Sequence, residues 1–168
     1  TGGKDFIFAH RSANPQELAT AIVRGAFEYQ GQKCSAASRA YIPASLWEIT
    51  KQHIIRMMSE IKTGDVTDFR NFVNAVIDEE SYDRIMSYIT KTKAAPDAEI
   101  IAGGEGDKSK GYFIKPTVIV TGNPHFITME EEIFGPVMTI YIYEDERFEE
   151  TLRLCDETSP FGLTGSIF

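Results

Sequence analysis

The stretch Phe27-Glu28-Tyr29-Gln30-Gly31-Gln32-Lys33-Cys34-Ser35-Ala36 joins a clear helical pattern to a strand-like run through a Gly-Gln turn. A thiol in that setting can be exposed and presented on a defined backbone. Backbone N–H groups at a sharp turn stabilise a thiolate and also a developing oxyanion. A covalent nucleophile needs this arrangement, whereas a core cysteine does not. The stretch therefore predicts that Cys34 is a nucleophile.

A buried core position is the competing interpretation of each cysteine, because free cysteine is among the most buried residue types. Cys155 fits it, since it lies on the apolar face of its helical pattern. Cys34 does not, because its neighbours Gln32, Lys33 and Ser35 are polar. Lys33 also adds positive charge beside the thiol, which would favour the thiolate.

Composition limits the class of protein. The 168 residues include 25 acidic and 17 basic ones, for a net charge of −8, which argues against nucleic-acid binding. The sequence has no run of 18 apolar residues, so we expect no membrane span. With no signal peptide and two distant, unlike cysteines, a reducing intracellular compartment is favoured.

The periodicity of the chain indicates an α/β fold. Asn14 and Pro15 mark a helix start, and Leu18, Ile22, Ala26 and Tyr29 lie on one apolar face of that helix. Further helices are predicted at 44–62 and 81–93 and from residue 148, and strands at 6–9, 38–42, 99–102, 112–114, 117–120 and 137–143. Alternating strands and helices imply a mostly parallel sheet covered on both faces.

Other chemistries have weaker support. His10, His53 and His125 stand in no recognisable dyad context, and no Cys, His and Asp cluster has metal-ligand spacing. Gly103-Gly104-Glu105-Gly106 lacks the strand–GxGxxG–helix order of a phosphate loop. A hairpin or surface turn is the better interpretation of that segment.

A second informative stretch is Met129-Glu130-Glu131-Glu132-Ile133-Phe134-Gly135-Pro136-Val137. By composition alone, three consecutive glutamates are usually a solvated surface. An apolar pair held by a rigid turn follows them, directly before a strand. A carboxylate and an aromatic ring fixed at a sheet edge would suit a cofactor built from a sugar and a ring.

The two stretches together resemble the motifs of the aldehyde dehydrogenase superfamily. The family's cysteine motif is similar to Gly31-Gln32-Lys33-Cys34, with Arg39 a few residues on. Its Glu-Glu-Ile-Phe-Gly-Pro-Val motif is similar to the segment from Glu131 to Val137. Three more segments add to the resemblance, so that it covers essentially the whole chain: Thr1-Gly2-Gly3-Lys4, Gly111-Tyr112-Phe113-Ile114-Lys115-Pro116-Thr117 and Phe161-Gly162-Leu163.

Within the superfamily, the cysteine stretch most resembles the 1-pyrroline-5-carboxylate dehydrogenases of proline catabolism. Further segments support this: Ser38-Arg39-Ala40-Tyr41-Ile42-Pro43, Ser45-Leu46-Trp47, Asp68-Phe69 and Ala75-Val76-Ile77-Asp78. The resemblance implies a three-layer α/β/α catalytic domain with a mostly parallel sheet. It also implies NAD-dependent oxidation of L-glutamate 5-semialdehyde to L-glutamate, with a small-molecule aldehyde as substrate.

The resemblance further implies roles for four residues. The Cys34 thiolate adds to the aldehyde, and its backbone N–H helps to hold the oxyanion; a thioester follows hydride transfer and is hydrolysed. Glu132 matches the glutamate that holds the nicotinamide ribose, and Phe134 the ring packed near the nicotinamide. Ser35 matches a position that helps to bind the substrate's α-carboxylate.

The resemblance makes the chain a fragment, because the family's general base, a glutamate, would stand just before Thr1. We expect residues 1–168 to be one partial catalytic domain without the NAD-binding domain, which folds but does not turn over. Alternatives are a dehydrogenase of another aldehyde, part of a bifunctional proline-oxidising protein, or a non-catalytic assembly domain. The resemblance implies a homo-oligomeric full-length protein in the bacterial cytoplasm or the mitochondrial matrix.

Overall fold

A computed structural model describes residues 2–168, and its centre is a six-stranded sheet of order β3-β6-β7-β2-β1-β8. Thr1, the first residue of one predicted motif, lies outside the described residues. Five of the strands run parallel and β3 pairs antiparallel with β6. The strands are β1 (Asp5–Phe8), β2 (Ala37–Pro43), β3 (Ala98–Ala102), β6 (Thr117–Thr121), β7 (Val137–Tyr143) and β8 (Gly165–Ile167).

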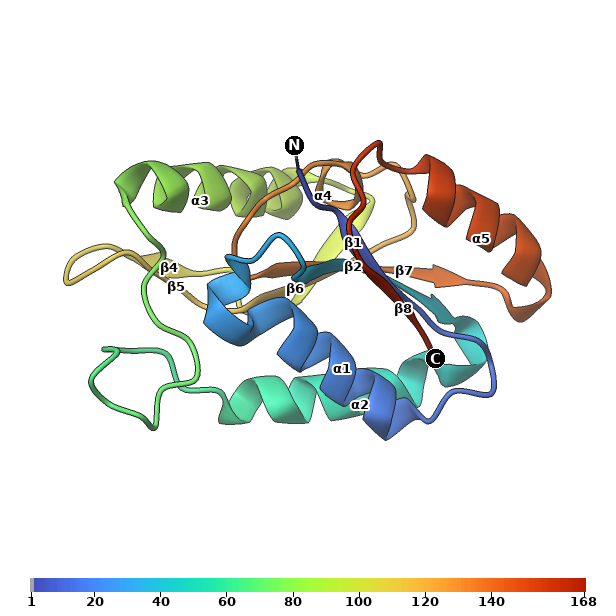
Figure 1. Cartoon of the computed structure of the whole chain (residues 1–168), viewed down its shortest axis with the longest axis horizontal. Helices are drawn as coiled ribbons and strands as arrows, with labels where there is room; N and C mark the ends of the chain where they lie inside the picture. The colour runs from blue at the N-terminus through green and yellow to red at the C-terminus, as the bar shows by residue number, and fades with distance from the viewer. Residues whose placement is uncertain (1) are drawn as a thin grey trace.

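Helices cover both faces of the sheet, as Figure 1 shows. One layer holds α1 (Pro15–Phe27) and α2 (Ala44–Glu60). The other holds α3 (Glu79–Ala94), the short α4 (Ile127–Glu130) and α5 (Phe148–Glu157). The predicted α/β class, with three layers and a mostly parallel sheet, is therefore confirmed.

Alternation along the strands divides the core between the two layers. Val118 on β6 packs toward α1 and α2, whereas its neighbour Ile119 packs toward α3. On β2, Ala40 and Tyr41 divide in the same way between the α1–α2 layer and a cluster that includes α5. Successive strand side chains point to opposite faces, which is why apolar runs without polar alternation form this sheet.

The predicted start of α1 is confirmed. The Asn14 side chain accepts hydrogen bonds from the backbone N–H groups of Gln16 and Glu17, and Pro15 occupies the first helical position. A side-chain acceptor at this position satisfies N–H groups that have no partner within the helix.

The predicted placement of Tyr29 on the buried face of α1 is wrong. The helix ends at Phe27, and the 3-10 segment Glu28–Gly31 turns the chain away. Tyr29 has a left-handed backbone and is 68% exposed. The apolar spacing of the sequence continues past the helix end, but the chain no longer follows the helix axis there.

The glycine-rich segment, predicted to be a hairpin or a surface turn, is a turn that leads into a short hairpin. Gly103 and Gly104 both have positive φ, and strands β4 (Gly106–Asp107) and β5 (Phe113–Ile114) pair antiparallel just beyond them. Between α2 and α3 the chain forms an irregular loop, closed by a bridge between Thr63 and Val73. No helix among residues 2–168 is both long and apolar enough to span a bilayer.

Candidate active site

The segment that carries Cys34 follows an unusual left-handed turn. Tyr29, Gln30 and Gly31 have consecutive φ values of 55°, 58° and 66°. Beyond them a tight turn, in which the N–H of Ala36 bonds the carbonyl of Lys33 at 3.1 Å, carries Cys34 and Ser35. Non-glycine residues with positive φ are uncommon and cluster at functional sites. The thiol of Cys34 is thus presented at the surface, where it is exposed.

Gly31 brings the cysteine stretch against the second predicted stretch. A β-carbon on Gly31 would lie 2.8 Å from the carbonyl carbon of Gly135 and 2.9 Å from the oxygen of Ala26. Any side chain at this position would overlap the backbone of both neighbours. The two stretches, about a hundred residues apart in sequence, are therefore in direct backbone contact.

Gly3 links Cys34 to Glu132. Its backbone N–H donates a hydrogen bond of 2.7 Å to Oε1 of Glu132. On its other side, a β-carbon would stand 3.3 Å from the carbonyl carbon of Cys34 and closer still to its oxygen. The predicted nucleophile and the predicted ribose ligand thus both contact one glycine, two residues before β1.

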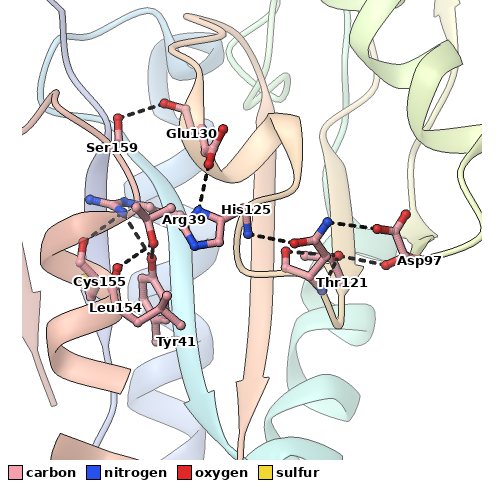
Figure 2. Close-up of polar contacts among 11 residues, drawn as sticks. Arg39, Tyr41, Asp97, Thr121, His125, Glu130, Leu154, Cys155 and Ser159 are labelled. Atoms are coloured by element: carbon pink, nitrogen blue, oxygen red, sulfur yellow. Dashed lines mark hydrogen bonds and ion pairs between the residues drawn. The ribbon is translucent and has the colours of Figure 1, made fainter. Parts of the chain in front are cut away.

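The three consecutive glutamates are not a uniformly solvated surface, because each has its own partner. Glu130 pairs with His125 at 2.8 Å, as Figure 2 shows. Glu131 accepts a hydrogen bond from the hydroxyl of Tyr88. Glu132 accepts the bond from the backbone described above. Of these three partners, only that of Glu132, Gly3, also contacts the Cys34 segment.

Phe134 stands at the rim of the same region. Its φ of 54° is left-handed, and its side chain is 40% exposed. Together with Lys33, Ala36 and Glu132 it lines a small cleft between the two stretches. Glu132 and Phe134 thus line one cleft with Gly3, and Gly3 contacts the backbone carbonyl of Cys34, next to which Ser35 is exposed.

Lys33, predicted to add positive charge beside the thiol, is paired with a carboxylate. Its ammonium pairs with Glu28 at 3.3 Å, and Arg24 bonds the same carboxylate at 2.8 Å. The hydrogen bond from Arg24, more than that from Lys33, holds the pKa of Glu28 below its ordinary value. The positive charge of Lys33 is thus partly neutralised by the carboxylate of Glu28.

Cys155 is buried, as predicted. Burial raises the pKa of its thiol, and the nearby guanidinium of Arg39 only partly opposes that rise. The two cysteines therefore differ in access, with Cys34 the one open to a reagent or substrate.

Arg39, matched in the sequence to the cysteine motif, is buried and donates hydrogen bonds to three different residues. Its guanidinium donates to the carbonyl of Lys4 at 2.9 Å, the hydroxyl of Tyr41 at 3.1 Å and the carbonyl of Cys155 at 3.0 Å. The last two contacts are drawn in Figure 2, and the bond to Cys155 ties β2 to α5. Removing the side chain would take this donor from the carbonyls of Lys4 and Cys155, whereas the Tyr41 hydroxyl would keep its bond to Thr158.

Lys4 is fully buried, which sequence reasoning missed. Its Nζ atom has no hydrogen-bond partner among residues 2–168. Burial, followed by repulsion from Arg39, lowers the pKa of Lys4 to about 7, while Glu132 and Glu131 act in the opposite direction. Nothing in the local pattern marks this position, since a lysine after a Gly-Gly pair usually indicates an exposed turn.

Asp5 binds the backbone of residues 163–164 beside the site, a contact that the sequence did not predict. Its Oδ1 atom accepts hydrogen bonds from the backbone of Leu163 at 2.8 Å and Thr164 at 2.7 Å. These residues lie more than 150 positions away, so only the pairing of β1 with β8 brings them together. An acidic residue opening an otherwise apolar strand was the available signal.

The histidines take no part in this grouping. His10 bonds Ser12 at 2.8 Å, and His125 bonds Glu130. Within residues 2–168, no group of three or more His, Cys, Asp or Glu side chains is placed to hold a metal ion.

Comparison with known families decides the class of the chain. A family model described as the aldehyde dehydrogenase family matches residues 1–168. The chain belongs to the aldehyde dehydrogenase family. The predicted resemblance is confirmed at this level, and the sheet described above is the fold of the family's catalytic domain.

Relatives narrow the likeness further. The chain is 58% identical, over 168 residues, to a protein of Dictyostelium discoideum named delta-1-pyrroline-5-carboxylate dehydrogenase, mitochondrial. It is 46% identical to the human protein of the same name. A crystal structure of the Mycobacterium tuberculosis delta-pyrroline-5-carboxylate dehydrogenase bound with NAD superposes with a TM-score of 0.92 at 42% identity.

The chain spans only part of these relatives. Between 99% and 100% of it aligns, but it covers 30% of each of the three proteins. The likeness therefore concerns about a third of the length of each relative.

Proposed function

We propose that residues 1–168 form one partial catalytic domain of an NAD-dependent 1-pyrroline-5-carboxylate dehydrogenase. The whole protein would oxidise L-glutamate 5-semialdehyde to L-glutamate. One observation carries the proposal: Gly3 contacts the backbone of Cys34 on one side and bonds the carboxylate of Glu132 on the other. Relatives named for this activity, at 58% and 46% identity, support the substrate.

Cys34 supplies the nucleophile in this proposal. Its sulfur forms a bond to the aldehyde carbon, and the carbonyl electrons move to oxygen as a thiohemiacetal forms. The backbone N–H of Cys34 would stabilise that oxygen, because preorganised donors act where charge develops. After loss of a hydride the carbon is held as a thioester, which water hydrolyses to the carboxylic acid and the thiol.

Glu132 and Phe134 fit the nicotinamide riboside part of NAD, which accepts the hydride when it is bound. A carboxylate anchored by the Gly3 N–H is a fixed acceptor for sugar hydroxyls. An exposed ring on a left-handed backbone offers a flat apolar surface beside it. A neighbour of this chain was solved with NAD bound, which supports the same cofactor here.

Ser35 is the proposed contact to the substrate's α-carboxylate. It is exposed and directly follows the nucleophile in the same turn. A hydroxyl donor at this position would select an acidic aldehyde over an apolar one.

We further infer that the full-length protein forms a homo-oligomer, and that it acts in the mitochondrial matrix or the bacterial cytoplasm. The names of the mitochondrial relatives and the bacterial source of the matched structures support that location.

The test uses the longer protein that contains this chain. NADH formation is followed with glutamate 5-semialdehyde and with propanal, in wild type, Cys34→Ser and the control Cys155→Ala. We expect turnover that favours the acidic aldehyde and is lost only in Cys34→Ser. A preference for propanal would contradict the substrate assignment, and full activity of Cys34→Ser would contradict the dehydrogenase itself.

A further inference from the structure

Helix α3 makes two polar contacts with the segment that carries Glu132 and Phe134. The guanidinium of Arg84 donates to the carbonyl of Ile133 at 2.5 Å. One turn later, the hydroxyl of Tyr88 donates to the carboxylate of Glu131. Residues four apart lie on the same face of a helix, so both contacts come from one face of α3.

Apolar packing from the same face completes the contact. Ile85 lies against Gly135 so closely that a β-carbon there would stand 2.8 Å from Cγ1 of Ile85. The Ile133 side chain is buried in a cluster with Ile85 and Ile89. Residues 131, 133 and 135 are therefore all fixed by α3.

The residue between the fixed positions is the strained one. Phe134 adopts a φ of 54°, which is unfavourable for a non-glycine residue. Phe134 is 40% exposed and lies outside the buried core, so core packing of its side chain does not account for this conformation. The backbone on either side does so, through Arg84 at Ile133 and through Ile85 at Gly135.

The donor role of Tyr88 is stable near neutral pH. Desolvation, followed by its bond to Glu131, raises the pKa of Tyr88 to about 12. The carboxylate of Glu131 accepts this hydroxyl, whereas the carboxylate of Glu132 accepts the backbone N–H of Gly3. The two adjacent carboxylates, Glu131 and Glu132, thus have different partners, one on α3 and one before β1.

We propose that Arg84 and Tyr88 are positioning residues for the cofactor: they hold the backbone around Phe134 so that Glu132 and Phe134 meet the nicotinamide riboside in a preformed geometry. This inference rests on the proposed function, because it assigns the same segment to the cofactor. Neither side chain touches the cofactor itself; both act through residues 131–134.

The test measures cofactor affinity in the longer protein. Arg84→Met keeps the stem but removes the donor, Arg84→Lys restores one, and Tyr88→Phe removes a single hydroxyl. Arg56→Met on α2 and Tyr82→Phe on α3 are the matched controls. Measured values are the Kd for NAD, the KM for each substrate, and the rate of Cys34 alkylation without NAD.

We expect Arg84→Met to raise the Kd and KM for NAD about tenfold, since a hydrogen bond from a charged donor is lost. Arg84→Lys should recover part of that loss, and Tyr88→Phe should raise both values about threefold. The KM for the aldehyde and the alkylation rate should stay near wild type. A merely structural role would instead lower the folded fraction and kcat without changing either NAD constant.

Unchanged NAD constants in both Arg84→Met and Tyr88→Phe, with wild type binding NAD, would overturn the inference and leave the proposed function intact. Should Arg84→Met not fold, Tyr88→Phe decides alone, because it preserves the ring packing. Absence of NAD binding by wild type would overturn the proposed function and this inference with it.

Discussion

The α-carbon of Gly31 lies directly against the carbonyl group of Gly135, and Gly31 has a φ of 66°. This contact fixes the turn that leads to Cys34 relative to the segment that carries Glu132 and Phe134. Both partners lack side chains, which lets two backbones approach where other residues would keep them apart. The geometry of the site thus depends on two glycines that carry no chemistry of their own.

Gly31→Ala should therefore damage the site and the fold together. The added β-carbon would overlap Gly135, and alanine pays roughly 1–2 kcal/mol for a left-handed backbone before that clash is counted. We expect a lower unfolding midpoint and loss of activity in the longer protein. Gly122→Ala is the control, because nothing lies within 4 Å of a β-carbon there. Equal behaviour of the two variants in thermal unfolding would argue against a rigid contact.

Gln30 should hold the loop between α2 and α3 against the cysteine turn. Its amide oxygen accepts from the N–H of Asn74 at 3.1 Å, and its nitrogen donates to the carbonyl of Ala75 at 3.4 Å. Gln30→Ala should cost roughly 1 kcal/mol of local stability, because two half-buried backbone groups lose their partners. Hydrogen exchange at residues 74–76 should quicken, whereas Gln52→Ala should leave it unchanged. Unaltered exchange in Gln30→Ala would refute the anchoring role.

Lys4 should make stability depend on pH in a predictable direction. Its pKa is about 7 in the folded chain against 10.5 ordinarily. Between these values the unfolded chain binds more protons, so stability rises with pH across that window. Below about pH 7 both states are protonated and the full penalty, on the order of 5 kcal/mol, applies.

Lys4→Met removes this titration. The variant should be more stable than wild type near pH 7, and its advantage should shrink as the pH approaches 10. Urea unfolding of both proteins across this range measures the difference. An advantage that stays constant with pH would show that Lys4 is not buried as an ammonium.

Cys34 should be alkylated by iodoacetamide at least about tenfold faster than Cys155 near neutral pH, because access and thiolate character govern the reaction. Cys34 is exposed, whereas Cys155 is buried and burial raises its pKa. Peptide mapping of the labelled protein gives the two rates. Similar slow rates would place Cys34 among structural thiols.

Much of the fold could be predicted from periodicity and helix-start residues. Asn14 and Pro15 fixed the start of α1, and apolar runs such as 137–143 marked the buried strands. The exposed Cys34 and buried Cys155 also followed from the polarity of their neighbours. These features are local, so the residues that determine them are adjacent in the chain.

The remaining features depend on contacts between distant residues. The left-handed turn at Tyr29 follows no spacing rule, and the apolar pattern even predicts the wrong face for that side chain. The bond from Gly3 to Glu132 spans 129 positions and uses a backbone N–H, which no side-chain pattern reveals. The burial of Lys4 and the hydrogen bond from Arg84 on α3 to the carbonyl of Ile133 likewise depend on how the sheet and the helices pack.

If Cys34 forms the covalent intermediate, that intermediate can be trapped. The longer protein is mixed with glutamate 5-semialdehyde and NAD, quenched in acid within the first turnover, and digested for mass spectrometry. We expect a glutamyl thioester on the peptide that contains Cys34 and none on the peptide that contains Cys155. NADH formation in the first turnover, with an acyl group on another residue or with Cys34 unmodified throughout, would contradict it.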